Sequence, residues 1–146
     1  MVELVQSLNF GMESMSINPI IEIKFSDEFK NDLRNLAKKY RSIRKDLQPI
    51  LDDLQAGNFK GDQIAHVSYT VFKQRLKNSD NKKGKSAGYR VIYYVKTSTS
   101  VILITIYSKS EQSDISATEV RRIIEKTSRS LITLAIYLAI ALQIKD

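Results

Sequence analysis

Basic residues concentrate in one stretch of this sequence. Residues 73–90 hold seven basic side chains and one acidic side chain, Asp80, whereas the rest of the chain holds 16 basic and 15 acidic residues. A focused cluster of cations raises the local concentration of phosphate groups, which a scattered excess does not. The stretch therefore predicts a surface for a polyanionic partner. Its basic residues are Lys73, Arg75, Lys77, Lys82, Lys83, Lys85 and Arg90.

The spacing of the first three cations predicts a row on a β-strand. Lys73, Arg75 and Lys77 alternate with less polar residues, and alternate residues of a strand share one face. Like charges on one strand face repel one another, and anions bound opposite them would relieve this repulsion. The row therefore indicates a site for anions. Each cation taken alone is also consistent with an ordinary solvated edge strand, whereas the cluster as a whole favours binding.

Composition narrows the class of protein. The 146 residues match a single domain, with ordinary globular fractions of 42% hydrophobic and 27% charged residues and a formal net charge of +7. The absence of cysteine excludes disulfides and thiolate metal sites, and the one histidine, His66, argues against zinc. We expect His66 to be a strand or loop residue rather than a general base. The first residues lack the apolar core of a secretory signal, so a cytoplasmic protein is expected.

Turn-forming residues and the spacing of apolar residues predict a strand over residues 20–25 followed by two helices. Ser26 is the expected N-cap of a helix over residues 27–40. A second helix over about 43–55 contains Pro49, which would lie in the first turn if Asp46 were the N-cap. The two helices are expected to form a hairpin.

Three further strands are predicted over about residues 66–77, 89–96 and 101–107. Their short connections, the basic loop 78–88 and the turn 97–100, favour an antiparallel meander, and the apolar third strand is expected in the centre of the sheet. Ser116 begins a capping box with Glu119, and Ile115 and Val120 are spaced as a hydrophobic staple. The predicted fold is α+β: a twisted antiparallel sheet with an N-terminal helical hairpin and a C-terminal helix.

This order of elements and several motifs resemble a known superfamily. The segments are "IKFSDEFKNDLRNLAKKY", "RKDLQPILDDLQAG", "VFKQRLKNSDNKKGKSAGYRVIYYV" and "ILITIYSKSEQSDIS". Over residues 20–126 the chain resembles the RelE/ParE superfamily of type II toxins, and most of all its RelE/HigB-type ribosome-dependent mRNA endonucleases. The pair "KSAGYRVIYYV" and "IYSKSEQSDIS" is the most distinctive part of the resemblance.

The resemblance implies an mRNA interferase that acts in the ribosomal A site. In such toxins the ribose 2′-OH of the message attacks the neighbouring phosphate, without a metal or small-molecule cofactor. Strand register matches Lys73 and Arg75 to the paired basic positions of the superfamily, and Arg90 to its phosphate-contacting arginine. Lys109 is expected as a further phosphate contact, and Tyr107 as a base-stacking or proton-donating residue. A non-specific attraction for RNA is expected of Lys77, Lys82, Lys83 and Lys85.

One position departs from the RNA-cleaving pattern. These toxins often have a tyrosine or histidine near the end as proton donor, and the matching position is Ser116, a poor acid that is expected to cap a helix. Either Tyr107 or a lysine would then have to act as the proton donor, or the catalytic assignment is wrong. The alternatives are a ParE-like, non-catalytic inhibitor of DNA gyrase and a degenerate toxin that only binds.

The chain is expected to divide into an N-terminal extension (1–19), a toxin domain (20–126) and an apolar tail (127–146). Residues 131–142 are apolar except for Thr133, and a helix of this length, about 18 Å, is too short to span a membrane. We expect it to pack on the sheet, to form an oligomer contact through residues 131–144, or to be covered by the antitoxin, with peripheral membrane association as a further alternative. The expected partners are a cognate antitoxin, the ribosome and mRNA.

Overall fold

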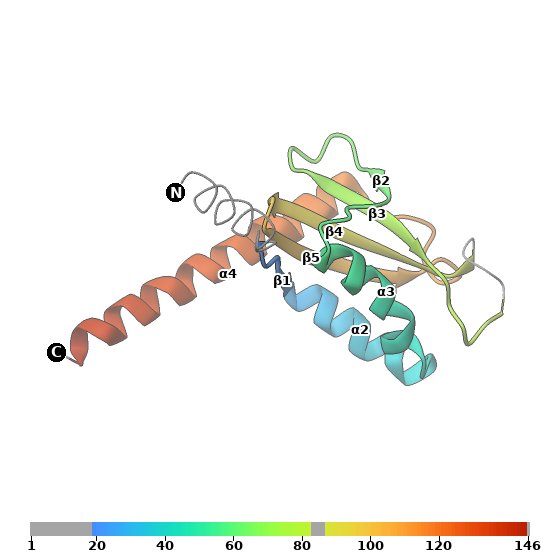
Figure 1. The fold of residues 1–146 in the computed structure, drawn as a ribbon, viewed down its shortest axis with the longest axis horizontal. Coiled ribbons are helices and arrows are strands. Elements are labelled where there is room, and N and C mark those ends of the chain that lie inside the picture. Colours follow the sequence, from blue (N-terminus) through green and yellow to red (C-terminus); the bar gives the residue numbers. More distant parts are fainter. Residues whose placement is uncertain (1–18, 83–86, 146) are drawn as a thin grey trace, which may run out of the picture.

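The computed structural model describes residues 19–82 and 87–145 as an α+β fold (Figure 1). The described elements, in chain order, are β1 (Glu22–Phe25), α2 (Asp27–Lys39), α3 (Ile43–Gln55), β2 (Asp62–Gln63), β3 (Val71–Leu76), β4 (Tyr89–Thr97), β5 (Ser100–Ser108) and α4 (Ala117–Ile144). The predicted helical hairpin, three-stranded meander and C-terminal helix are all present.

The five strands form one mixed sheet in the order β1-β5-β4-β3-β2. The pairs β2–β3, β3–β4 and β4–β5 are antiparallel, as the short connections predict, whereas β1 adds to β5 in parallel. The two helices that follow β1 carry the chain across the sheet, so β1 ends beside the last strand rather than beside its neighbours in sequence. The predicted strand over 66–77 begins only at Val71, because His66 and Ser68 have φ values of 64° and 71° that a strand excludes.

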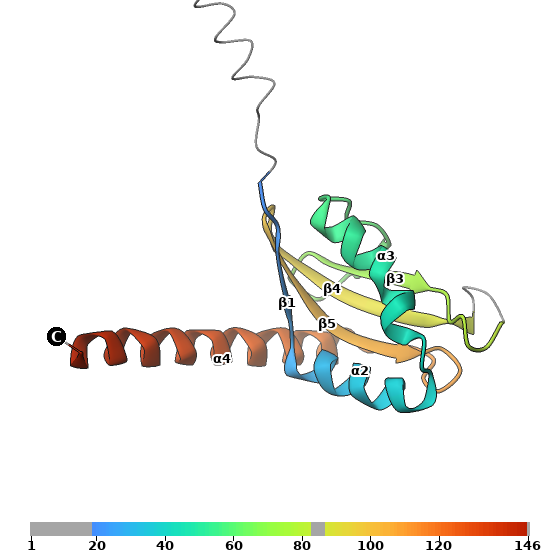
Figure 2. The same cartoon turned by 60° about the horizontal axis from the view of Figure 1, so that its bottom comes forward.

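Each face of the sheet carries its own apolar core. On one face α2 and α3 cover a cluster that includes Phe29, Leu54, Tyr93 and Leu103. On the other face the first turns of α4 cover a cluster that includes Ile92. Figure 2 shows α4 and the α2–α3 pair as separate layers around the strands. The residues of β4 and β5 thus alternate between two buried environments. β5 is almost wholly buried, as its apolar run predicts, whereas β4 is buried only from Tyr89 to Tyr93.

Serine caps fix the starts of two helices as predicted. The hydroxyl of Ser26 accepts a hydrogen bond from the backbone N–H of Phe29 at 2.9 Å, and Ser116 accepts one from Glu119 at 3.1 Å. The Glu119 carboxylate does not complete a capping box, because it accepts two hydrogen bonds from Arg122, at 2.9 and 2.7 Å. Ile115 packs against the cluster that contains Val120, as the staple requires.

The expected N-cap of α3 is wrong. The helix begins at Ile43, with Ser42 as its N-cap, so Asp46 lies in the first turn and Pro49 inside the helix. The Asp46 carboxylate instead accepts hydrogen bonds from the backbone N–H and the hydroxyl of Ser79, both at 3.0 Å. This contact attaches the segment that follows β3 to helix α3.

α4 leaves the body of the molecule halfway along its length. Val120, Ile123 and Ile124 are buried against the sheet, whereas every residue from Ile132 to Ile144 is exposed. Figures 1 and 2 show the helix running past β1 and away from the sheet. The expectation that residues 131–142 pack on the sheet is therefore wrong beyond Leu131, because the sheet ends first. The boundary expected at residues 126 and 127 falls inside this one continuous helix.

Candidate nucleic-acid interface

Three predicted site residues form one row across three strands. Arg75 on β3 is the register partner of Arg90 on β4, which in turn pairs with Tyr107 on β5. Directly opposed residues of neighbouring strands project from the same face, with strands about 4.8 Å apart. Tyr107 belongs to the cluster under α4, so this face is the one on which α4 packs. Residues from three strands thus meet on one surface.

Lys73 lies on the same face, two residues before Arg75. Its register partner is Ile92, a member of the α4-side cluster. Lys77, the third cation of the predicted row, lies beyond the end of β3 and is exposed. The row expected on one strand is therefore two cations long, and Arg90 and Tyr107 extend it across the sheet.

Gly88 permits the close approach that aligns Arg90 with Arg75. A Cβ atom on this residue would lie 2.0 Å from the carbonyl oxygen of Leu76, so no other residue type fits without moving the backbone. The carbonyl of Gly88 also accepts a hydrogen bond from the N–H of Lys109 at 2.9 Å, which ties the end of β5 to the same place. The "AGYR" segment thus fixes the register of the row as well as supplying its arginine.

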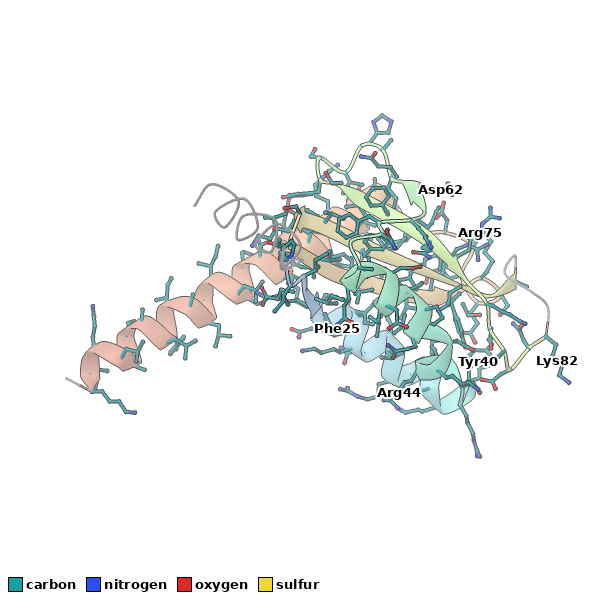
Figure 3. All side chains as sticks on the ribbon, in the orientation of Figure 1. Phe25, Tyr40, Arg44, Asp62, Arg75 and Lys82 are labelled. Atoms are coloured by element: carbon teal, nitrogen blue, oxygen red, sulfur yellow. The ribbon has the colours of Figure 1, made fainter. Side chains whose placement is uncertain are left out.

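The two arginines differ in exposure. Arg75 is exposed at the end of β3, and Figure 3 shows its side chain projecting from the sheet. In the described part of the chain, Arg75 has no ion pair. Arg90 is only 7% exposed, and its guanidinium donates a hydrogen bond to the carbonyl of Tyr89 at 3.2 Å. Arg75 therefore offers an accessible charge, while Arg90 contributes its charge from within the sheet surface.

Asp114 touches two members of this surface, and sequence reasoning missed it. Its Oδ1 atom lies 3.1 Å from Nζ of Lys73 and accepts hydrogen bonds from the Tyr107 hydroxyl at 3.4 Å and the Ile115 N–H at 2.8 Å. The Ile115 N–H, and then the Lys73 ammonium, hold the pKa of Asp114 below its usual range. The aspartate stands in the quoted "SDIS" segment, but only the folding of the loop before α4 brings it over Lys73.

Tyr107 is set up to remain protonated. The side chain is 6% exposed, and burial, followed by the negative charge of Asp114, raises its pKa to about 12, against the opposing influence of Arg90. A phenol with this pKa donates hydrogen bonds throughout the neutral range and does not act as a base.

The other predicted residues lie around the row. Lys109 is exposed, and its ammonium donates a hydrogen bond to the carbonyl of Ser113, within the loop that also carries Asp114. Lys82 is exposed in the loop after β3, whereas Lys83 and Lys85 lie outside the described residues. His66 lies in a loop, as expected, and its carbonyl accepts a hydrogen bond from Arg121.

At the end of β3 the basic residues also border the α3 side of the sheet. Arg75 and Lys77 line a cavity of about 370 Å³ there, whose other walls include Asp46, Asp53 and Lys60. Over residues 19–82 and 87–145, no group of three or more histidine, cysteine, aspartate or glutamate side chains is arranged to hold a metal ion.

A family comparison covers this surface and most of the chain. The model of the family described as the RelE toxin of the RelE/RelB toxin–antitoxin system matches residues 29–141. The match includes β2 to β5, the Arg75–Arg90–Tyr107 row and most of α4. Membership implies a toxin that is paired with an antitoxin, and it supports a cytoplasmic location. The chain belongs to the RelE toxin family.

Proposed function

We propose that this toxin is a ribosome-dependent endoribonuclease that cuts translated mRNA and so arrests translation. The observation that carries the proposal is the row Arg75–Arg90–Tyr107, which places two cations and a protonated phenol on one face, with Lys73 beside them. Cleavage of a ribose–phosphate backbone by its own 2′-OH requires charge stabilisation at phosphorus and a proton for the leaving oxygen. The row offers groups for both tasks.

Each group has a role in this reaction. The 2′-oxygen forms a bond to phosphorus while the bond from phosphorus to the 5′-oxygen breaks, and Arg75, Arg90 and Lys73 stabilise the negative charge that develops. Tyr107 donates its proton to the leaving 5′-oxygen. Asp114 contacts the row and stays ionised at neutral pH, so we assign it the acceptance of the 2′-OH proton, although its lowered pKa makes it a weak base.

A translating extract tests this function. We expect primer extension on a translated mRNA to find new 5′ ends within codons when the toxin is added, and none when translation initiation is blocked. Arg75→Ala, which removes an exposed cation of the row, should abolish or greatly slow cleavage. Arg44→Ala is the matched control, because Arg44 is also an exposed arginine but lies on α3, away from the row (Figure 3). Equal cleavage by both variants would contradict the proposal.

One observation favours a second candidate, the non-catalytic inhibition of DNA gyrase. The hydroxyl of Ser116, at the position of the usual terminal acid, accepts the capping hydrogen bond of α4 and is not an acid. A gyrase supercoiling assay with the same preparations distinguishes the candidates. Intact mRNA together with inhibited supercoiling would replace the endoribonuclease by this second function.

A further inference from the structure

The distal half of α4 presents a large apolar surface to solvent. Eight of its large apolar side chains are between 50% and 80% exposed. They are Ile132, Leu134, Ile136, Tyr137, Leu138, Ile140, Leu142 and Ile144. Most monomeric soluble proteins do not expose a contiguous patch of this kind, and such a patch marks an interaction surface.

The exposed leucines continue the face by which α4 packs on the sheet. At 3.6 residues per turn, Leu134, Leu138 and Leu142 fall on the stripe that begins with the buried Val120 and Ile124. We call these three leucines the leucine seam. Ile132, Ile136 and Ile140 form a second stripe on the opposite side of the helix. The same face that is buried on the sheet therefore runs on, uncovered, beyond the edge strand β1.

The leucine seam is complementary to itself in an antiparallel arrangement. A two-fold axis at Leu138 would bring Leu134 opposite Leu142 of a second helix, and Leu138 opposite its own copy. No charged residue lies between Arg129 and Lys145, so the seam offers nothing to an acidic or basic partner. A like apolar helix fits it, and opposed helix dipoles also favour the antiparallel direction.

The ends of such a pair are complementary as well. In this register the C-terminal turn of the second helix reaches Leu131, where a groove of about 220 Å³ separates α4 from the start of α2. Phe25 and Asp27 line this groove, and Phe25 is 36% exposed. The partner's Lys145 would meet the Asp27 carboxylate on the wall of the same groove.

From these observations we propose that a second copy of this chain docks antiparallel on the leucine seam. Each exposed apolar side chain offers on the order of 100 Å², and a two-helix contact covers roughly half of them. The pair then buries on the order of 800 Å² in total, below the range of stable specific complexes and typical of weak, transient ones. The dimer is therefore expected to be weak and reversible.

A lipid surface fits the seam less well than a second copy. α4 is long and apolar enough to span a membrane, and its most apolar 18-residue window is not buried. The uncharged segment 130–144, however, is about 22 Å long, shorter than the hydrocarbon layer of roughly 30 Å. The leucine seam continues the face that packs on the sheet, and it is complementary to itself. Both features are expected of a protein contact, and binding to lipid requires neither.

Sedimentation equilibrium of the full chain between about 1 and 100 μM tests the proposal. We expect a monomer–dimer equilibrium that the triple variant Leu134→Gln/Leu138→Gln/Leu142→Gln weakens at least tenfold. The matched control, Ile132→Gln/Ile136→Gln/Ile140→Gln, changes equally exposed residues on the opposite stripe and should leave the dimer within about threefold of the original affinity. A monomer over this range, or a larger effect of the isoleucine variant, overturns the proposal.

Cysteine pairs test the direction, because the chain has no cysteine of its own. Under mild oxidation Leu138→Cys should cross-link to itself, and Leu134→Cys should cross-link to Leu142→Cys in a mixture but not to itself. Self-cross-linking of Leu134→Cys would indicate a parallel pair and overturn the antiparallel register. Co-flotation of monomeric protein with phosphatidylcholine–phosphatidylglycerol vesicles, lost in the leucine variant, would assign the seam to lipid instead.

Discussion

Arg75 and Arg90 face one another directly across β3 and β4, although like charges in this position oppose strand pairing. The surrounding structure holds them there. Gly88 allows the strands to approach at the turn, and Tyr89, beside Arg90, is fully buried on the other face of the sheet. The proposed mRNA substrate would place a phosphate group near both of these cations.

Replacing Arg75 with alanine should therefore separate stability from binding. The substitution removes the repulsion from Arg90, which stabilises the protein, and it removes side-chain packing that favours the strand, which destabilises it. Because the two effects oppose one another, we expect the free energy of unfolding to stay within about 0.5 kcal/mol of the original value. Binding to single-stranded RNA should weaken, and the slope of log K against log salt should become shallower by about 0.7, the value for one lost phosphate contact. Urea denaturation and a filter-binding salt titration measure the two effects. A stability loss above about 1 kcal/mol would show that Arg75 is structural.

Replacing Asp114 with asparagine should tighten RNA binding but slow cleavage. The change removes an anion that competes with phosphate for Lys73, and partly exposed pairs of this kind contribute at most about 1 kcal/mol, so we expect up to roughly fivefold tighter binding. Cleavage should slow, because the proposed acceptor of the 2′-OH proton is lost. Fluorescence anisotropy gives the affinity, and single-turnover cleavage on programmed ribosomes gives the rate. Weaker binding together with unchanged cleavage would contradict both roles.

The same carboxylate predicts a pH dependence of stability. The pKa of Asp114 in the folded protein is lowered from an ordinary value of 3.8, by the Ile115 N–H and then by Lys73. Its contribution to stability is therefore present above pH 3.8 and is lost as the pH falls through the lower, folded value. The unfolding free energies of the native chain and Asp114→Asn should differ by less than about 1 kcal/mol at pH 7 and converge toward pH 2. Burial raises the pKa of Asp32, which acts in the opposite sense but cancels in this difference.

Sequence reasoning works where short-range chemistry decides the structure. Ser26 and Ser116 cap helices because a serine hydroxyl reaches an N–H three residues on, which the sequence alone displays. The strands 89–97 and 100–108 follow from apolar runs separated by a tight turn. Lys73 and Arg75 share a face because strand residues alternate, and this required no knowledge of the tertiary fold.

Sequence reasoning fails where contacts between residues distant in the sequence decide the structure. Nothing near β1 indicates that it will pair in parallel with β5, about 80 residues later. The side chain of Asp46 could serve as an N-cap, but its carboxylate accepts a hydrogen bond from Ser79, and α3 begins earlier, at Ile43. Asp114 becomes part of the site only when its loop folds over Lys73. The apolar pattern of residues 131–142 predicts burial, but the width of the sheet, which ends at β1, decides how much of α4 is covered.

Replacing Tyr107 with phenylalanine should slow cleavage without weakening binding. The change keeps the buried ring and removes the hydroxyl, whose hydrogen bond to Asp114 is long at 3.4 Å, so little stability should be lost. Removal of a general acid typically costs about 10²- to 10⁴-fold in rate. Because burial raises the pKa of Tyr107 to about 12, the native rate should not fall between pH 7 and 9 through loss of this proton. A rate equal to that of the native chain would assign proton donation elsewhere.

Gly88 offers a test of how the row is held in register. An added Cβ would lie 2.0 Å from the Leu76 carbonyl oxygen, so Gly88→Ala must push apart the strand ends that place Arg90 beside Arg75. We expect a stability loss of about 2 kcal/mol or more, in line with overpacked sites, and weaker RNA binding in the protein that remains folded. Gly57→Ala is the comparison: φ there is +79°, but the nearest atom to its Cβ, Cδ1 of Ile21, is 3.5 Å away. That variant should lose stability through backbone strain alone and keep its affinity for RNA. Amide hydrogen exchange should show faster opening of β3 and β4 near the turn only in Gly88→Ala, and equal exchange in both variants would mean that Gly88 does not set the register.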